Sequence, residues 1–597
     1  MRLPLRYRSI RWTAAPLLLG VLLVGACATT GSAPAGTIDM STTPPDPDPR
    51  IGLAAGQLDA GQAAWNLRLV SNTPPAEGFV GVTNSDLAFR GDFVIQGNYN
   101  GYQVWDVSSP ARPTLKTAFL CPASQSDVSV YQNLLFVSGE GLTGRVDCGT
   151  QGVQDTVSAD RLRGIRVFDA TDIANPKYVA NVQTCRGSHT HTVVTDPRDR
   201  NHVYIYVSGS AGVRSPSELP GCSALAPSED PNSALFRIEV IRVPLAAPQQ
   251  AAIVTSPRIF EGLAAAPRRT EPAPAGRPVN SNRPQRARTG PTQCHDITVY
   301  PEVGLAGGAC GGYGLLLDIS DVANPRRIDA AADTNMSFWH SATFSNDGDK
   351  ILFTDEWGGG RAARCRVTDR YEWGANALFT IENRRMRFHS YYKMPAAQTE
   401  QENCVAHNGS LIPIPDREVM VQGWYQGGIS VFDWTDVANP KEIAFFDRGP
   451  LDAARLTSAG SWSAYWYNGY IYSSEIARGL DIIELLPSAF ITQNEIDAAK
   501  TVRFDFLNAQ EQRKLVWPPS FALARAYLDQ LARGNGLAAD RIEAARSDLV
   551  RAERMSGQDR RAALTQLATR LNAEAARARD AAKVRKLASA VGELAAN

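Results

Sequence analysis

The side chains best suited to chemistry in this sequence are histidines, of which 597 residues contain only seven. Four of them, His189, His295, His340 and His407, each begin a similar short run of alternating apolar and polar residues. Imidazole binds transition metals and also transfers protons near neutral pH. If the four runs are equivalent strands, these histidines predict either a metal site or an acid–base site. His191 follows His189 by two positions and should point to the same side of its strand, which makes it a fifth candidate ligand.

Acidic residues recur near the histidines in the repeated pattern. Some follow the second apolar run of a unit, and others come one position after its opening residue: Glu140, Asp355, Glu356 and Glu475 in the first group, Asp127 and Asp296 in the second. Carboxylates orient imidazole ligands or balance the charge of an ion. We expect Glu356 to be the general acid or base, and imidazole-rich ligation favours copper, with zinc and iron as further candidates. Tyr425 and Trp462 are expected in an aromatic rim beside this site.

A purely structural role accounts for the same histidines. Ser85, Ser126 and Ser461 occupy the equivalent position in the other units, and both serine and histidine can bond to a neighbouring backbone. Repeats also copy such residues simply by duplication. The sequence contains no Gly-x-Ser-x-Gly elbow, Walker loop, His-Glu-x-x-His or haem-binding Cys-x-x-Cys-His motif that would identify a catalytic class. The metal, acid–base and structural hypotheses therefore all stay open.

The elements that must position these residues are copies of one unit. The phrase from Trp105 to Pro113 returns from Phe168 to Pro176, from Leu317 to Pro325 and from Phe432 to Pro440. Each copy begins with a run of β-branched or aromatic residues, which predicts a strand, and an aspartate follows this run. A polar turn that contains proline then ends the strand, and an apolar run after the turn predicts the next strand. Self-similarity of this kind indicates an array of equivalent strand-turn-strand units.

Seven units can be counted from their opening residues. The openings are at Ser85, Ser126, His189, His295, His340, His407 and Ser461. Each is followed by further strand-like runs, so four antiparallel strands recur and predict a seven-bladed β-propeller. The last unit lacks a fourth strand, and the unassigned run from Trp65 to Val70 can supply it and close the ring. Opening strands line the channel of a propeller, which places the four histidines on an arc at one channel mouth.

The repeated Asp-x-Ser/Thr-Asp-x-Ala-Asn-Pro phrase resembles the LVIVD-repeat family of bacterial surface β-propellers, over roughly residues 65 to 487. The resemblance implies a propeller fold at the bacterial surface and does not imply a particular activity. The histidine arc is similar only in outline to propellers that hold copper on channel histidines, such as the selenium-binding and methanethiol oxidase proteins.

The N-terminus predicts export and a lipid anchor. Four arginines precede an apolar stretch from Ala14 to Val24, and residues 24–27 resemble a lipobox that ends at Cys27. We expect residues 1–26 to be a lipoprotein signal peptide, Cys27 to be lipidated, and residues 27–63 to be a flexible tether. Ala28 in the second mature position favours the outer membrane, on its periplasmic or surface side. The membrane is thus one partner, and a protein or an envelope polymer is a second.

The net charge and the number of cysteines bear on the partners and on the disulfide bonds of this protein. Removing the four arginines of the signal from 61 basic residues leaves 57 against 61 acidic ones, which gives no support to a nucleic-acid partner. Eight cysteines remain after Cys27, and an even number in an exported protein predicts disulfides. Eight cysteines allow 105 connectivities. Closure of neighbours within each blade or loop predicts the pairs Cys121–Cys148, Cys185–Cys222, Cys294–Cys310 and Cys365–Cys404.

Two segments depart from a plain ring. Residues 257–291 are rich in Pro, Ala and Arg and predict a disordered basic insertion within the propeller, which spans residues 64–487. Residues 488–597 contain helical Ala/Arg/Glu/Leu segments, including Ser520–Arg533, Ala538–Met555 and Asp559–Ala578, and predict a small helical bundle.

Two functions follow from these observations. The first is an envelope-anchored propeller that binds a ligand or a protein partner on the top face of its channel. The second is a metal-dependent oxidoreductase or hydrolase that uses the histidine cluster, with copper favoured.

Overall fold

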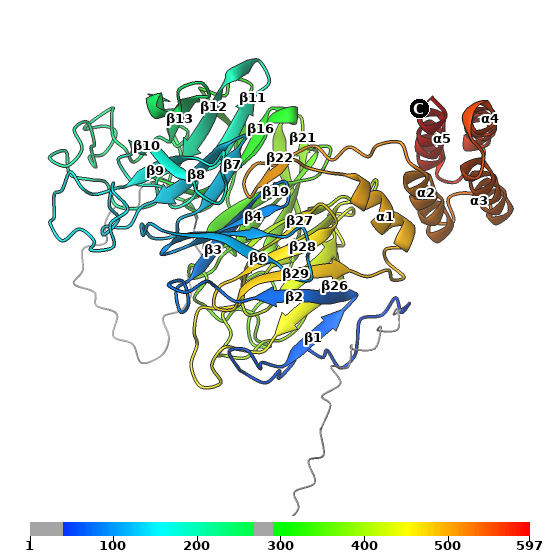
Figure 1. Ribbon diagram of the computed structural model, residues 1–597, viewed down its shortest axis with the longest axis horizontal. Helices are drawn as coiled ribbons and strands as arrows, with labels where there is room; N and C mark the ends of the chain where they lie inside the picture. Colours follow the sequence, from blue (N-terminus) through cyan, green and yellow to red (C-terminus); the bar gives the residue numbers. More distant parts are fainter. Residues whose placement is uncertain (1–39, 268–289, 597) are drawn as a thin grey trace, which may run out of the picture. The chain divides into compact units, whose positions relative to one another are not determined.

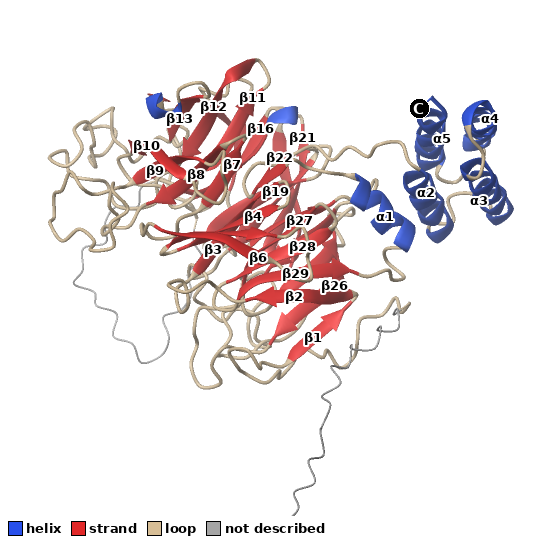
Figure 2. Cartoon of the chain, in the orientation of Figure 1, coloured by secondary structure: helices blue, strands red, loops and turns tan. Residues whose placement is uncertain are grey.

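Antiparallel sheets account for most of the regular secondary structure in the computed structural model, which describes residues 40–267 and 290–596 (Figures 1 and 2). Seven four-stranded units follow one another, which confirms the predicted seven-bladed β-propeller. The first strands of neighbouring blades contact each other and are therefore the inner strands. In the sixth and seventh blades these inner strands pair in parallel and join the two blades into one nine-stranded sheet.

The strands of the first four blades are β3 (Asn84–Arg90), β4 (Phe93–Asn98), β5 (Gly101–Asp106) and β6 (Thr114–Leu120); β7 (Val128–Tyr131), β8 (Leu134–Gly139), β9 (Gly164–Asp169) and β10 (Lys177–Gln183); β11 (Thr192–Asp196), β12 (Asp199–Val207), β13 (Glu239–Pro244) and β14 (Ala252–Thr255); and β15 (Cys294–Tyr300), β16 (Leu305–Cys310), β17 (Tyr313–Asp318) and β18 (Arg326–Ala331). The last three blades comprise β19 (Trp339–Phe344), β20 (Lys350–Asp355), β21 (Asn376–Glu382) and β22 (Arg385–Tyr392); β23 (Asn408–Ile412), β24 (Val419–Gly423), β25 (Ile429–Asp433) and β26 (Lys441–Arg448); and β27 (Ser461–Tyr467), β28 (Tyr470–Glu475), β29 (Gly479–Leu485) and β2 (Leu67–Thr73). Two short 3-10 helices, η1 (Pro248–Gln250) and η2 (Pro301–Val303), lie in connections.

The ring is closed by β2, as predicted. It pairs antiparallel with β29, from Leu67 opposite Leu485 to Thr73 opposite Leu480. The N-terminal strand thereby supplies the fourth strand that the last blade lacks. Closure covers the backbone edge that an open array would expose.

The repeated phrase ends the third strand of four blades. Its first aspartate lies at the end of β5, β9, β17 or β25 and accepts a hydrogen bond from the backbone N–H two residues later, for example Ser108 N to Asp106 Oδ1 at 3.0 Å and Thr171 N to Asp169 Oδ1 at 2.9 Å. In three of the four copies a second aspartate repeats the bond, as Asp172 Oδ1 does by accepting from Ala174 N at 3.0 Å, whereas Ser109 stands at this position in the first copy. These side-chain turns reverse the chain before the fourth strand and explain why the phrase recurs.

The hydrophobic core is divided into layers between blades. Between the seventh and first blades, Phe89 stacks on Tyr467 with ring centroids 4.6 Å apart and meets Tyr472 edge-on at 5.4 Å. Aromatic pairs of this kind contribute about 0.5–1.5 kcal/mol beyond the area that they bury. Every residue of β27 is buried because neighbouring blades cover both faces of the strand.

All four predicted disulfides are present: Cys121–Cys148, Cys185–Cys222, Cys294–Cys310 and Cys365–Cys404. Their cysteines lie where inner strands begin, in the connections that lead to inner strands, at the end of a second strand, or in the loops that follow second strands. In an antiparallel blade these positions share one face of the ring. The four bridges therefore fasten the face at which the four histidines were expected.

The segment before β1 differs from the expected tether. Arg50 is 2% exposed and pairs with Asp48 and Glu442, with Nη2 2.7 Å from a carboxylate oxygen of each. Gly56 N donates to Pro450 O at 2.9 Å, and β1 (Gln62–Trp65) adds a fifth strand beside β26. The tether boundary predicted at residue 63 is thus wrong, because an ion pair and backbone hydrogen bonds dock a segment that has few apolar residues. The signal peptide, Cys27 and most of the basic insertion (268–289) lie outside the described residues.

The C-terminal region is helical, as predicted. Helices α2 (Phe521–Arg533), α3 (Ala539–Glu553), α4 (Gly557–Ala575) and α5 (Ala581–Ala596) share one apolar core. Helix α1 (Gln493–Thr501) begins with a capping box made by Thr492 and Glu495, and Glu495 also pairs with Arg417 of the sixth blade and Arg533 of α2. Within the described part of the chain, no helix is long and apolar enough to cross a membrane.

Residues 504–515, which we name the plug segment, connect α1 to α2 and were not predicted. The plug segment contains β30 (Phe506–Asn508), which pairs with Ala88–Arg90 of β3. It also bonds to Val299 of β15 and Phe344 of β19, several residues beyond His295 and His340 along the same strands. At about 3.3 Å per residue, these contacts lie at the opposite end of the channel from the histidines.

The buried carboxyl group of Glu511, in the plug segment, makes the stability of the folded protein depend on pH. The Glu511 side chain is buried and accepts a hydrogen bond from Asn508 Nδ2 at 2.9 Å. Burial raises the pKa of Glu511 to about 7, Glu302 adds to the rise, and Asn508 and Arg513 oppose it. When folding raises the pKa of a carboxyl group, the folded protein loses stability as the pH rises from the ordinary pKa of that group through its pKa in the folded state. We therefore expect Glu511→Gln to increase the free energy of unfolding by roughly 2–3 kcal/mol at pH 8.

That gain should disappear below about pH 4.5, where Glu511 is protonated in both folded and unfolded chains. Urea titrations of wild type and Glu511→Gln at pH 4.5 and 8 make the comparison. A difference of equal size at both pH values would show that ionisation of Glu511 is not its source.

Candidate metal centre

Four histidine rings from consecutive blades lie in one continuous arc. His295 and His340 belong to inner strands β15 and β19. His407 immediately precedes β23, and His189 lies three residues before β11. Ring centroids are 4.6 Å apart for His189 and His295, 3.9 Å for His295 and His340, and 4.1 Å for His340 and His407. The structure therefore brings together the four histidines that open the third to sixth blades.

Three of the rings are oriented through Nδ1. His189 Nδ1 lies 2.5 Å from Glu140 Oε1, His295 Nδ1 lies 2.9 Å from Asp296 Oδ1, and His407 Nδ1 bonds to the carbonyl oxygen of Trp462. An ionised carboxylate or a carbonyl can only accept, so each bond places a proton on Nδ1. In the neutral ring the lone pair is then on Nε2, which is the arrangement that metal-binding histidines use.

Glu356 follows β20 and faces two of these rings. Its Oε2 is 3.8 Å from His340 Nε2, and its Oε1 is 3.7 Å from His407 Nε2. Both distances are too long for hydrogen bonds. Two ligand atoms each about 2.1 Å from one ion can lie at most about 4.2 Å apart, so both distances suit joint ligation. Ligand atoms of His295, His340 and Glu356 lie within 4.8 Å of one another, which is wider than this limit, so ligation of one ion by all three requires these atoms to move slightly closer together.

The lone pairs that would bind an ion are buried. His340 and His407 are each 1% exposed, and among the described residues His340 Nδ1, His340 Nε2 and His407 Nε2 have no hydrogen-bond partner. A buried polar atom without a partner costs about 1–3 kcal/mol. Burial lowers the pKa of His407 to about 3, and burial together with neighbouring rings lowers that of His340 well below its usual value. Both imidazoles are therefore neutral and carry free lone pairs at physiological pH.

Tyr425 joins the centre from the sixth blade, although the sequence suggested only an aromatic rim. Its hydroxyl is 2.5 Å from Glu356 Oε1, and its ring centroid is 4.6 Å from that of His407. The backbone of Tyr425 has φ +54°, which is uncommon for a bulky residue and is typical of functional sites. Glycine at 460 permits this conformation, since a Cβ there would lie 2.1 Å from the Tyr425 carbonyl carbon.

Several predicted site residues lie elsewhere or have structural partners. His191 was expected beside His189, but β11 begins only at Thr192, so strand alternation does not apply, and His191 Nδ1 instead lies 2.8 Å from Ser138 Oγ. Asp355 accepts backbone N–H groups of Ser337, Phe338 and Gly374, and Glu475 pairs with Arg478. Asp127 is buried within the ring, and burial together with Asp86 and Asp296 raises its pKa well above the usual value.

The turn after Glu356 offers a sharp test of this geometry. Gly359 and Gly360 are adjacent and have similar φ, +64° and +67°. A Cβ at Gly360 would lie 2.3 Å from the Tyr425 hydroxyl and 2.7 Å from Glu356 Oε1, whereas at Gly359 nothing is within 4 Å. We expect Gly360→Ala to separate Tyr425 from Glu356 and to weaken metal binding about tenfold or more.

Gly359→Ala is the matched control because it carries only the cost of a left-handed alanine, about 1 kcal/mol. Competition with a chromophoric chelator gives both affinities. Equal losses in the two variants would show that backbone strain, and not the Tyr425–Glu356 contact, controls the affinity.

Comparison with known proteins adds similarity in fold alone. No family model matches the chain, and no curated protein is significantly similar to it. Similar solved structures include the Myceliophteria thermophila Cps50 (Swd1) β-propeller domain, at 10% identity over 67% of this chain and 98% of that chain with TM-score 0.37. The N-terminal domain of Nup159 is 9% identical over 75% and 100% of the two chains with TM-score 0.39, and Kuenenia stuttgartiensis hydrazine synthase is 9% identical over 66% and 93% with TM-score 0.40. The propeller assignment rests on the strand pairing.

Proposed function

We propose that this protein is a metal-dependent β-propeller of the cell envelope that holds one first-row transition-metal ion on its histidine arc. The single observation that supports this most is the placement of the Glu356 carboxylate 3.7–3.8 Å from the buried Nε2 atoms of His340 and His407. A structural histidine would bond its ring nitrogens to protein groups, and among the described residues neither nitrogen of the buried His340 ring does so. His295 and, with a small movement, His189 complete the proposed donor set.

The donor set indicates which metals suit the site. Imidazole nitrogens with one carboxylate are ligands for copper, zinc and iron, and Cu²⁺ stands highest in the general order of affinity. Glu356 would then serve as a ligand, with Tyr425 fixing its orientation. Copper or iron would supply electron transfer, and zinc would activate water. The chain's own contribution is a set of rings held by Glu140, Asp296 and the Trp462 carbonyl.

The remaining parts of the proposal come from the sequence. We infer from the sequence that the propeller is exported, is lipidated at Cys27 and lies at the outer membrane. Its LVIVD-like repeats and its disulfides suit such a location. A propeller is also compatible with a scaffold that binds a ligand or a protein partner on the same face. Such a scaffold would not need unpartnered buried imidazoles, so we place the metal first.

Elemental analysis of the protein purified after export tests the proposal. We expect about one equivalent of copper, zinc or iron, retained through dialysis and lost in the His295→Ala/His340→Ala double variant. His191→Ala is the control because it removes another buried histidine that lies outside the arc. Wild-type protein that binds no metal after reconstitution with Cu²⁺, Zn²⁺ and Fe²⁺ would leave the ligand-binding scaffold as the function.

A further inference from the structure

The plug segment replaces missing strand partners at the far end of the channel. The side chain of Asn508 accepts from Val130 N at 2.7 Å and donates to Val130 O at 2.8 Å. Gln512 does the same for Phe344, at 2.8 and 2.9 Å. The backbone of the segment brackets Val299, which donates to Gln510 O and accepts from Gln512 N, both at 2.9 Å. The segment is therefore bonded to inner strands of the second, fourth and fifth blades.

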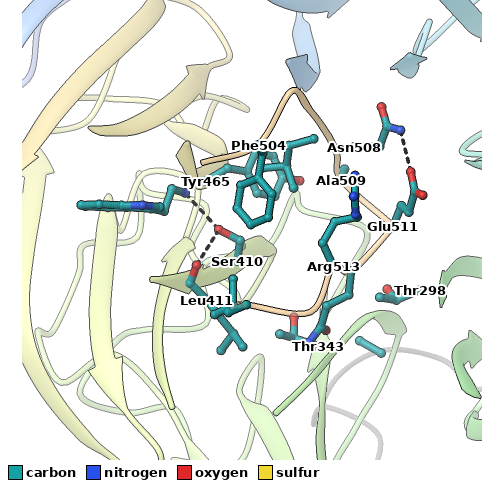
Figure 3. Close-up of a pocket in the computed structure, with 16 residues that line it drawn as sticks. Thr298, Thr343, Ser410, Leu411, Tyr465, Phe504, Asn508, Ala509, Glu511 and Arg513 are labelled. Carbon is teal, nitrogen blue, oxygen red and sulfur yellow. Dashed lines mark hydrogen bonds between the residues drawn. The ribbon is translucent and has the colours of Figure 1, made fainter. Parts of the chain in front are cut away.

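A small cavity lies beside the plug segment. Figure 3 shows a cavity between the plug segment and inner strands, with Tyr465, Phe504 and Leu411 on one side and Thr298, Glu511 and Arg513 on the other. Its volume is about 50 Å³. A water needs roughly 10–15 Å³, so the cavity has room for a few waters and not for a larger ligand. Phe506, Leu507 and Leu515 pack against the hydrophobic cores of the blades, so hydrogen bonds and apolar contacts together fix the segment.

One side chain of the plug segment reaches the histidine arc through the channel. Gln510 is 2% exposed, and its Nε2 donates to Asp296 Oδ2 at 3.4 Å. The other oxygen of the same carboxylate, Oδ1, accepts from His295 Nδ1 at 2.9 Å. Asp296 is itself 1% exposed, so its two oxygens connect the far end of the channel to a ring of the candidate metal centre.

We propose that Gln510 is a positioning residue for the metal ligand His295 and acts through Asp296. This inference rests on the metal site proposed above and deepens it: the segment that leads to the helical bundle becomes part of the site. A metal-bound histidine depends on the group that fixes its second nitrogen, and that group depends on its own hydrogen bonds. The Thr190 hydroxyl also bonds to the Asp296 carboxylate, so loss of the Gln510 amide would remove one of the groups that hold this carboxylate and would loosen the ring of His295.

The variant Gln510→Leu keeps a side chain of similar size and removes the donor. We expect it to weaken Cu²⁺ or Zn²⁺ binding about three- to tenfold, less than the 10–100-fold typical of a residue that bonds a ligand directly. Gln512→Leu is the matched control, since it removes two hydrogen bonds to Phe344 but touches no residue of the arc. We expect it to lower stability at least as much and to leave affinity within twofold.

A double-mutant cycle separates positioning from general loosening. In an Asp296→Asn background, Gln510→Leu should have no further effect on affinity if it acts through Asp296. Full additivity in the cycle, or an equal loss of affinity in Gln512→Leu, would overturn the proposal.

Metal-free protein gives a readout that does not depend on the proposed metal. With only seven histidines, ¹⁵N-histidine labelling can resolve the His295 ring nitrogens by NMR. We expect wild type and Gln512→Leu to show His295 protonated on Nδ1, and Gln510→Leu to show mixed tautomers or broadened signals. An unchanged His295 spectrum in Gln510→Leu would refute the positioning role, even if the metal site exists. A changed spectrum in a protein that binds no metal would instead count against the metal site alone.

Discussion

Replacing Glu356 with glutamine is expected to lower the affinity for Cu²⁺ or Zn²⁺ by at least about 100-fold, more than the 10–100-fold effect of residues outside the ligand set. The neutral amide is a poorer ligand than a carboxylate, and it removes the negative charge that faces His340 and His407 at 3.7–3.8 Å. Isothermal titration or chelator competition on the folded variant measures the change.

The same substitution should not destabilise the metal-free protein. The Glu356 side chain is 7% exposed, and burial raises its pKa, so the ionised group is costly in the fold. A glutamine amide carries no charge and can donate to the unpartnered Nε2 of His340 or His407 after a small movement. Lost affinity together with equal or greater stability is the signature of a residue retained for function.

Glu475→Gln is a matched control for Glu356→Gln. Glu475 is also buried, at the end of the second strand of a blade, but it pairs with Arg478 at 2.9 Å. Its loss should lower stability and leave metal affinity unchanged. Metal binding in Glu356→Gln that equals wild type would exclude Glu356 as a ligand, and so would equal losses in the two variants.

The second large effect is expected from Arg50→Ala, which should cost about 3–5 kcal/mol. Glu442 is 5% exposed and would remain buried without its guanidinium partner. Arg50 also lies over the Phe445 ring, with its guanidinium carbon 3.7 Å from the ring centroid. Urea denaturation at pH 7 gives the change in free energy. Limited proteolysis should in addition cut residues 51–61 faster.

The double variant Arg50→Met/Glu442→Met separates loss of the pair from exposure of one charge. Replacing both members of a buried ion pair with apolar residues is often close to neutral. We expect the double variant to recover most of the lost stability. A cost below about 1 kcal/mol for Arg50→Ala, which is the range of an exposed pair, would show that the segment is not docked through this contact.

The parts of the fold that could be predicted are those written in local sequence. The aspartate turns after β5, β9, β17 and β25 recur as one phrase, and strand β2 was found because the last blade lacked a partner. The disulfides followed from pairing neighbours along an ordered array, with separations of 16 to 39 residues. The docking of the segment around Arg50 was not predicted, because an ion pair with Glu442, 392 residues away, cannot be recognised from the composition of the segment.

The residues of the candidate site differ in the same way in how far the sequence predicts them. The arc of four histidines was visible because the repeat places them at equivalent positions. Tyr425 was expected only in an aromatic rim, because its partner Glu356 is 69 residues away and its only local signal is a bulky residue among glycines. Gln510 lies 214 residues from Asp296 and outside the repeats, so its place in the channel could come only from three dimensions. His191 was misplaced because strand periodicity was applied before the strand begins.

The four disulfides have a consequence for the order in which this protein is assembled. Before oxidation the cysteines of these four bridges are eight free thiols on the same face of the ring as the arc, and thiolates bind copper(I) and zinc more strongly than imidazoles do. Metal supplied to the reduced chain would therefore be captured by cysteines and would block their pairing. The histidines can compete only once the sulfurs are bonded to each other. For the proposed metal site, oxidation therefore has to come before metallation, and we expect protein made in a reducing cytoplasm to bind metal on its cysteines.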